Sequence, residues 1–333
     1  MGPAGVQGFM YPNEVELQWS VLIVLYPYIT GLVAGAFILA SLSRIFNIAA
    51  VKPIYRLSLL TALAFLLVAP LPLQLHLGHP ERSFEMYLTP HKTSAMAMFG
   101  FVYLWYLLVV LLTEIWLDYR GDIVRLAQTH RGPMKWIYAA LTLGSYHVSA
   151  ASRRIDDRVG WAVTLIGIPS AFLLHGYVGF IFGAVKANPW WSTPLMPIVF
   201  LFSAMVSGIA AVLVVYQATT RIRKKEADML CLDTVAKYLF YVFLIDFSLE
   251  MLDLVHRMYE SNESFRALDF MVHTRLYFSQ IVVQIYLGTL LPIGMLAVTQ
   301  VVKLRAPIRR VLYTTRRIRW RSQRAKGCCL PLR

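Results

Sequence analysis

Acidic side chains recur within one strongly apolar stretch of the chain, 235–257, although ionisable groups are costly inside a membrane. Asp246, Glu250 and Asp253 are spaced by four and three residues. In a helix these spacings place the three carboxylates on one face. Glu114 lies in another apolar run. Because intramembrane carboxylates commonly carry protons, we predict that these four residues form a proton relay.

Histidine, tyrosine and glutamine side chains gather at one depth in other apolar runs, toward the outer face of the membrane. They are Tyr26, Tyr28, His76, His79, His175, Tyr177, Gln280 and Gln284. Such groups could bind the two carbonyl oxygens of a quinone, whose reduction or oxidation also moves two protons. An apolar bundle would admit the isoprenoid tail. We therefore predict a quinone site here, with Tyr26, His76, His79, His175 and Gln280 among its contacts.

Other interpretations of the same residues stay open. A lone membrane histidine or tyrosine commonly hydrogen-bonds a neighbouring helix. Glu114 lies near the end of its run and could simply be paired or extend to the interface. His76 and His175 could face each other as haem ligands, although the chain lacks the paired histidines of di-haem proteins. The three cysteines form no C-x-x-C motif, so we expect no metal site.

Seven apolar runs must position these side chains. Their bounds are 19–42, 56–77, 95–117, 160–185, 194–216, 235–257 and 277–302. Each is long enough to cross a hydrocarbon core of about 30 Å as a helix. The composition agrees, since 58% of residues are hydrophobic and 15% are charged. The sequence therefore predicts an all-α, polytopic transmembrane helix bundle over residues 19–302.

The basic residues predict the orientation of the bundle. The segments that would share the side of the C-terminus hold 26 of the 32 Lys and Arg residues, and they are 43–56, 118–159, 217–237 and 303–333. Positive residues stay on the cytoplasmic side of membrane proteins. We therefore expect a periplasmic segment 1–18 and a basic cytoplasmic tail 303–333. The net charge of +14 then reflects topology and attraction to anionic lipid, and not nucleic-acid binding.

One stretch, 134–151, leaves the number of spans open. It is apolar but short. As an eighth span it would reverse the orientation of everything after it. We interpret it as a helix that lies in the cytoplasmic interface.

Two blocks of sequence resemble the NrfD/PsrC family of membrane subunits from polysulfide-reductase-type complexes. The first block contains Leu77-Gly78-His79-Pro80-Glu81-Arg82, then Pro90, then Thr93-Ser94-Ala95-Met96. The second contains Gly176-Tyr177-Val178-Gly179, then Gly183-Ala184-Val185-Lys186-Ala187-Asn188-Pro189-Trp190, then Thr193-Pro194-Leu195. The resemblance covers about residues 20–300. Where the family commonly has an acid and an arginine, this chain has His76 and His79.

The resemblance implies a subunit of the bacterial inner membrane that binds menaquinone or ubiquinone and no haem or metal. It implies that Tyr177 contacts the quinone and that Glu81, Arg82 and Lys186 dock a partner. That partner would be a periplasmic, ferredoxin-like iron–sulfur subunit, joined to a molybdopterin or multihaem cytochrome subunit. Such a chain is not expected to be active alone.

Two other functions are weighed against this one. A passive membrane anchor would hold a catalytic partner without binding quinone. An ion transporter would need a polar path through the full membrane, and the inner halves of the runs are mainly aliphatic and aromatic.

Overall fold

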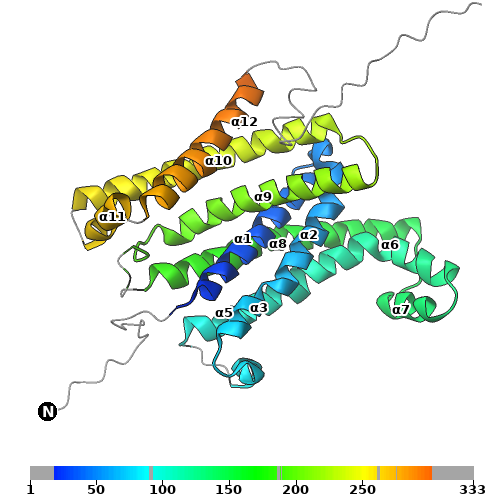
Figure 1. Cartoon of the computed structure of the whole chain (residues 1–333). Coiled ribbons are helices and arrows are strands. Elements are labelled where there is room, and N and C mark those ends of the chain that lie inside the picture. Colours follow the sequence, from blue (N-terminus) through cyan, green and yellow to red (C-terminus); the bar gives the residue numbers. More distant parts are fainter. Residues whose placement is uncertain are drawn as a thin grey trace, which may run out of the picture.

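Long helices packed side by side form the protein (Figure 1). The computed structural model describes residues 19–301 except 90–92, 186–187, 189, 261–262 and 275. Over these residues every regular element is a helix and none is a strand. The predicted all-α class is therefore confirmed. The segments 1–18 and 303–333, predicted to be periplasmic and cytoplasmic, lie outside the described residues.

The helices follow one another closely along the chain. In order they are α1 (Val21–Arg44), η1 (Ala49–Ile54), α2 (Tyr55–Val68), α3 (Pro70–His76), η2 (Pro80–Arg82), α4 (Glu85–Leu88), α5 (Ala95–Leu104), η3 (Trp105–Leu112), α6 (Thr113–Thr129), α7 (Pro133–Leu141), α8 (Ala150–Gly183), α9 (Met196–Ile222), α10 (Met229–Glu260), α11 (Glu263–His273), η4 (Phe278–Leu290) and α12 (Leu291–Val301). The segments η1 and η2 are 3₁₀ helices, whereas η3 and η4 are π-helical.

Six helical stretches within the described residues are long and apolar enough to cross a membrane, so the chain is a multi-pass membrane protein. They are Val21–Arg44, Ala49–His76, Ala97–Thr129, Ala150–Gly183, Met196–Ile222 and Phe278–Gln300. Each contains most of one predicted run. The remaining run, 235–257, lies in α10, which packs along α9 and α12. Its three acidic residues make it too charged to count as a span by apolarity alone.

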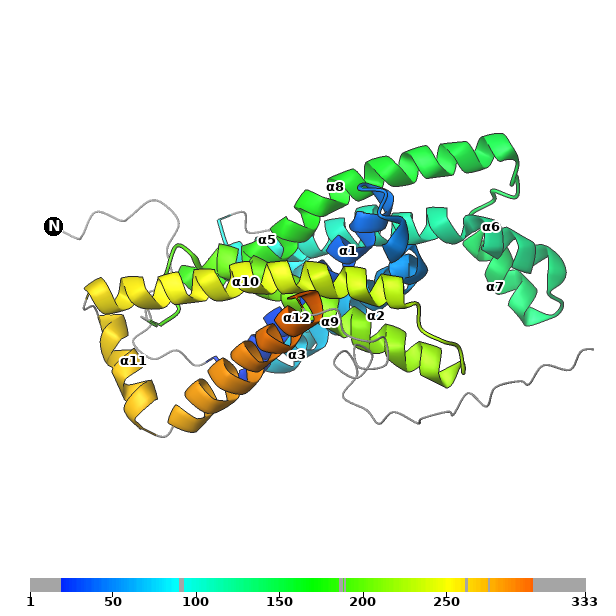
Figure 2. The same cartoon turned by 90° about the horizontal axis from the view of Figure 1, so that it is seen from above.

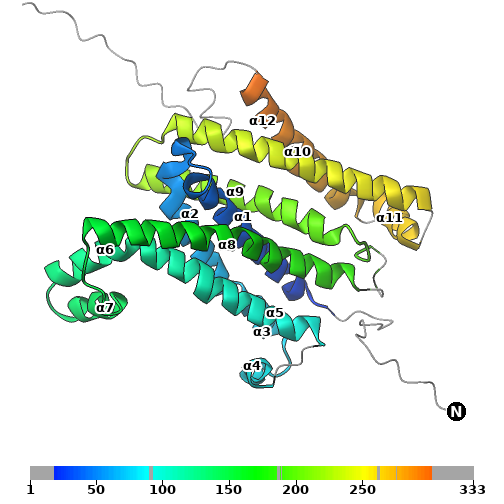
Figure 3. The ribbon, with the colours of Figure 1, turned by 180° about the vertical axis from the view of Figure 1, so that it is seen from behind.

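Successive long helices run in opposite directions, so the bundle has two ends (Figures 1 and 3). The His76 end is where α1, α5 and α9 begin and where α3, α8 and α10 finish. The Arg56 end is the opposite one, where α2, α8 and α10 begin. Figure 2 shows α11 at one side of the bundle and α6 with α7 at the other.

The segment predicted to be either an interfacial helix or an eighth span is short. Helix α7 has nine residues and is therefore about 14 Å long, less than half of the hydrocarbon thickness. It lies beside α6, where the Trp116 indole nitrogen donates to the Leu141 carbonyl at 2.9 Å. A helix of this length cannot supply the eighth span.

Helix α1 is the centre of the bundle and contacts α2, α8 and α9. Its approach to α9 is closest where two glycines meet. A Cβ built on Gly208 would lie 2.5 Å from the Cα of Gly35, and one on Gly35 would lie 2.8 Å from the Cα of Gly208. Because lipid gives helices little hydrophobic reason to associate, such close backbone packing supplies much of their attraction. Gly31 and Gly35 match the G-x-x-x-G pattern of such helix contacts, and Gly35 makes the closest of them here.

Candidate functional site

Three aromatic rings from different helices meet at the His76 end. Tyr26 of α1 contacts Phe99 of α5 edge-on, with ring centroids 5.4 Å apart. Tyr177 of α8 stacks on the same Phe99 at 6.0 Å. These three residues are termed the aromatic cluster. They bring together two predicted quinone contacts that are 151 residues apart in the sequence.

The Tyr26 hydroxyl is the unusual group in this cluster. Only 6% of the surface of Tyr26 is exposed, and among the described residues its hydroxyl has no hydrogen-bond partner. A buried hydroxyl left without a partner costs about 1–3 kcal/mol. The Tyr26 hydroxyl is therefore a hydrogen-bonding group that the side-chain contacts of the cluster leave unused.

The two histidines near the end of α3 have separate partners. His76 Nδ1 lies 2.9 Å from the Ser20 hydroxyl, which also caps the first turn of α1. This contact ties the beginning of α1 to the end of α3. His79 pairs with Glu81 at 3.0 Å in the exposed loop that follows. The structure therefore places His76 beside the first turn of α1 and His79 at the surface.

His175 is buried more deeply and joins three helices. Its Nδ1 lies 3.3 Å from the hydroxyl of Thr30 on α1, and its ring stacks on Phe200 of α9 at 5.6 Å. A Cβ on Gly31 would lie 3.1 Å from the His175 ring, so that glycine makes room for it. These contacts describe a histidine that hydrogen-bonds a neighbouring helix, as one of the sequence interpretations expected.

A second group of predicted residues lines a pocket of about 550 Å³ between α9, α10, α11 and η4, here termed the α10 pocket. Glu250, Asp253 and Gln280 all contribute to its wall. Asp253 accepts hydrogen bonds from Thr193 at 3.0 Å and from Arg257 at 2.6 Å. Asp246 is buried one turn away from Glu250, and its Oδ1 has no partner within the described part of the chain.

The single cluster predicted from sequence is therefore divided. Tyr26 belongs to α1, and His175 and Tyr177 belong to α8. Gln280 instead lines the α10 pocket together with Glu250 and Asp253. The division follows from packing, because α9 lies between the two groups (Figure 1). Helices α1 and α8 contact α9, and α10 contacts α9 from the opposite side.

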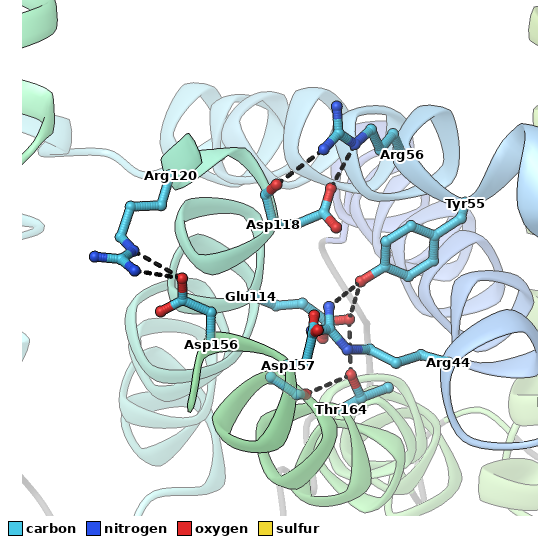
Figure 4. Close-up of polar contacts among 10 residues, drawn as sticks. Arg44, Tyr55, Arg56, Glu114, Asp118, Arg120, Asp156, Asp157 and Thr164 are labelled. Carbon is cyan, nitrogen blue, oxygen red and sulfur yellow. Dashed lines mark hydrogen bonds and ion pairs between the residues drawn. The ribbon is translucent and has the colours of Figure 1, made fainter. Parts of the chain in front are cut away.

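A buried polar network at the Arg56 end was not foreseen from the sequence (Figure 4). The carboxylate of Glu114 accepts hydrogen bonds from the Tyr55 hydroxyl at 3.0 Å and from Thr164 at 2.8 Å. The Arg44 guanidinium donates to the same Tyr55 oxygen at 2.5 Å. Glu114 is fully buried, and its second oxygen has no partner among the described side chains. These contacts join Glu114 to α2 and α8, and not to the acids of α10.

Two arginines continue this polar region toward the end of the bundle (Figure 4). Arg56 bonds Asp118 at 2.7 Å and Asp122 at 2.8 Å. Arg120 pairs with Asp156 of α8 at 2.5 Å and is almost fully buried. These ion pairs tie α2, α6 and α8 together. The Arg56 end of the bundle is therefore more polar than the apolar runs indicated.

The loop at the His76 end carries the predicted docking residues Glu81 and Arg82. The guanidinium of Arg82 donates two hydrogen bonds of 2.8 Å to the carboxylate of Glu85. These bonds hold the pKa of the Glu85 carboxyl below its usual value and raise the pKa of Arg82. The side chains of Arg82 and Glu85 are both exposed, so a partner could reach them. Lys186, the third predicted docking residue, lies outside the described residues.

This ion pair predicts a local dependence on pH. A carboxyl whose pKa is lowered by folding stabilises the fold above its unfolded pKa of about 4.3, and that stabilisation disappears as the pH falls through the lowered value. We expect hydrogen-exchange protection of residues 80–88, corrected for intrinsic rates, to fall in this acid range. Glu85→Gln should remove the dependence and Glu81→Gln should keep it. The same profile in the wild type and Glu85→Gln would show that the pair has no such role.

Comparison of the chain with known proteins identifies one family. A family model described as "Polysulphide reductase, NrfD" matches residues 11–314. A selenate reductase subunit of Mesobacillus selenatarsenatis is 35% identical over 204 residues, which are 60% of this chain and 47% of that protein. A putative dimethyl sulfoxide reductase membrane subunit of Halobacterium salinarum is 28% identical over 228 residues, covering 66% of this chain and 48% of that one.

Protein NrfD of Escherichia coli is 28% identical over 204 residues, which are 60% of this chain and 59% of that protein. The chain thus spans about half the length of the curated relatives that it matches. The family match is wider, since it includes all six membrane-crossing stretches and the aromatic cluster. The resemblance found in the sequence is confirmed, and the chain belongs to the NrfD polysulphide reductase family.

Proposed function

We propose that this protein is the membrane subunit of a respiratory oxidoreductase complex in the bacterial inner membrane, where it exchanges electrons between the quinone pool and a periplasmic iron–sulfur subunit. The family membership supports a reductase complex. So do relatives named as subunits of selenate and dimethyl sulfoxide reductases. In this proposal α10 is a seventh span and the His76 end is periplasmic. A molybdopterin or multihaem cytochrome subunit is the further member of the complex.

The observation that carries the proposal is the Tyr26 hydroxyl, which is buried in the aromatic cluster and has no hydrogen-bond partner among the described residues. A bound menaquinone or ubiquinone would supply the two-electron, two-proton chemistry. Tyr26 would donate a hydrogen bond to one ring oxygen, while Phe99 and Tyr177 would pack against the ring. Their partly apolar surroundings would keep water from the reacting oxygens.

The docking surface proposed for the iron–sulfur partner is the exposed loop with η2 and α4, at the same end as the aromatic cluster. Glu81 and Arg82 present both signs of charge there. Opposite charges on a partner would fix its orientation and speed its encounter. Lys186 stays part of this proposal through its motif position alone.

The predicted proton relay divides in the same way as the predicted quinone site. Glu250 lines the α10 pocket and Asp246 lies one turn deeper without a partner on Oδ1 among the described residues, so these two acids can accept and pass protons. Asp253 is held by Arg257 and Thr193, which suits a fixed charge better. Glu114 belongs to the network at the Arg56 end.

The test is quinol turnover by the purified complex after Tyr26→Phe and Tyr177→Phe. Loss of the Tyr26 hydrogen bond should raise the KM for quinol about fivefold, because one such bond contributes about 1 kcal/mol. We propose that the Tyr177 hydroxyl also binds the second ring oxygen, so Tyr177→Phe should act similarly. Tyr28→Phe is the matched control, since Tyr28 is 60% exposed and lies two residues along the same helix.

Unchanged KM and kcat in both cluster variants would remove these residues from the quinone site. A passive anchor predicts that result and also predicts that no quinone co-purifies with the complex.

A further inference from the structure

The α10 pocket has its own apolar and polar walls and shares no residue with the aromatic cluster. Apolar side chains form most of its lining, among them Met196, Val199, Phe247, Met251, Leu254 and Ile281. Glu250, Gln280 and Gln284 add carboxylate and amide groups on two facing helices. Its volume of about 550 Å³ falls within the range of small-molecule sites.

One polar wall of this pocket is already fixed by internal contacts. Arg257 donates to Asp253 at 2.6 Å, and its guanidinium lies 4.9 Å from the centre of the Trp190 ring. Thr193 holds the other oxygen of Asp253 at 3.0 Å. These contacts join the start of α9 to α10 and give the pocket a rigid rim.

The charged and amide side chains of the pocket determine which ligand charge it can accept. Glu250, Asp253 and Asp269 all line the pocket. Arg257 pairs with Asp253, and His273 Nδ1 lies 2.9 Å from the carboxylate of Asp269, so Glu250 is a third carboxylate beside these two pairs. This excess of carboxylates disfavours a phosphate head group. The amides of Gln280 and Gln284 can each donate and accept hydrogen bonds. A neutral ring with carbonyl or hydroxyl oxygens satisfies these groups without adding negative charge.

We infer that the α10 pocket is a second binding site for a quinone-class molecule, distinct from the aromatic cluster; the choice of ligand class rests on the proposed function. Gln280 and Glu250 bind the ring oxygens, and Met251 and Ile281 contact the ring and the start of its tail. Methionine side chains adapt readily to such ligands. Glu250 can accept a proton from a ring hydroxyl, and Asp246 lies four residues further into the helix.

The experiment is photolabelling of the purified complex with a short-chain azidoquinone, followed by peptide mapping. Labels are expected on α10 or η4 in addition to α1, α5 or α8. Ile281→Trp fills the pocket and should reduce labelling of α10 and η4 about tenfold, with labelling of the aromatic cluster unchanged. Val283→Trp is the matched control, because Val283 is exposed on the same helix and does not line the pocket.

The outcomes separate this inference from the proposed function. Labels confined to α1, α5 and α8 would overturn the second site and leave the first intact. Labels confined to α10 and η4 would support the pocket and count against the aromatic cluster. No specific label at either place would contradict both. Displacement of the pocket label by phosphatidylethanolamine, but not by excess unlabelled quinone, would show a lipid site and overturn the inference.

Discussion

Replacing Glu114 with alanine is expected to lower the free energy of unfolding by about 3–5 kcal/mol, because it removes one partner from a buried charged network. Glu114 is fully buried and accepts from Tyr55 and Thr164. Without its carboxylate, both hydroxyls lose an acceptor. The Arg44 guanidinium also loses the charge that it reaches through the Tyr55 hydroxyl. Reversible unfolding in mixed micelles, followed by circular dichroism, measures the change.

Two variants make this result specific. Glu114→Gln keeps an oxygen for Tyr55 and Thr164, so its loss should be about 1 kcal/mol. Asp157→Asn should have almost no effect. Asp157 is 84% exposed and lies 4.0 Å from Arg44, and exposed ion pairs contribute little. A loss for Glu114→Ala no greater than that for Asp157→Asn would mean that the network does not stabilise the bundle.

A second large effect is expected at the crossing of α1 and α9. Gly208→Ala places a methyl group 2.5 Å from the Cα of Gly35, so the two backbones must separate. Overpacking of this kind costs about 1–3 kcal/mol. The movement would also disturb Thr30 and His175, which bridge α1 and α8 near the same crossing. We expect a lower unfolding midpoint in the same micelle assay and weaker retention of bound quinone.

Gly294→Ala is the control for helix propensity. A Cβ at Gly294 meets no atom within 4 Å, and alanine favours a helix by about 1 kcal/mol over glycine. This variant should therefore be neutral or more stable. If Gly208→Ala behaved like Gly294→Ala, the close approach of α1 and α9 would not matter for stability.

The apolar runs predicted the membrane helices well but not where they end. The run 160–185 lies mostly inside α8, which begins ten residues earlier at Ala150. The run 95–117 belongs to a helical stretch that continues to Thr129. Apolarity reports the part of a helix that lipid surrounds. The extra turns carry charges such as Arg120 and Asp156, which satisfy one another across helices and so extend the helices into the polar region.

The sequence predicted the residue types of the candidate site and their depth, but not the direction in which each side chain points. Tyr26 and Tyr28 looked equivalent in the sequence, yet the first is buried and the second exposed. Two residues along a helix turn the side chain by about 200°, so one tyrosine enters the bundle when the other leaves it. Nothing in the residue pattern indicated that Tyr55 and Thr164 meet Glu114, because the three residues come from separate helices whose relative rotation only packing determines.

Because we interpret α7 as an interfacial helix, we expect it to fix the depth at which the bundle sits in the bilayer. Its side chains Trp136 and Ile137 are exposed, and such residues favour the boundary between head groups and acyl chains. The helix cannot move independently, because Trp116 holds its last residue and Arg120 holds Ser145 and His147 just beyond it. Vertical sliding of the protein would carry α7 out of that boundary. We therefore expect the loop with η2 and α4, at the opposite end, to stay at a constant height over the other membrane surface.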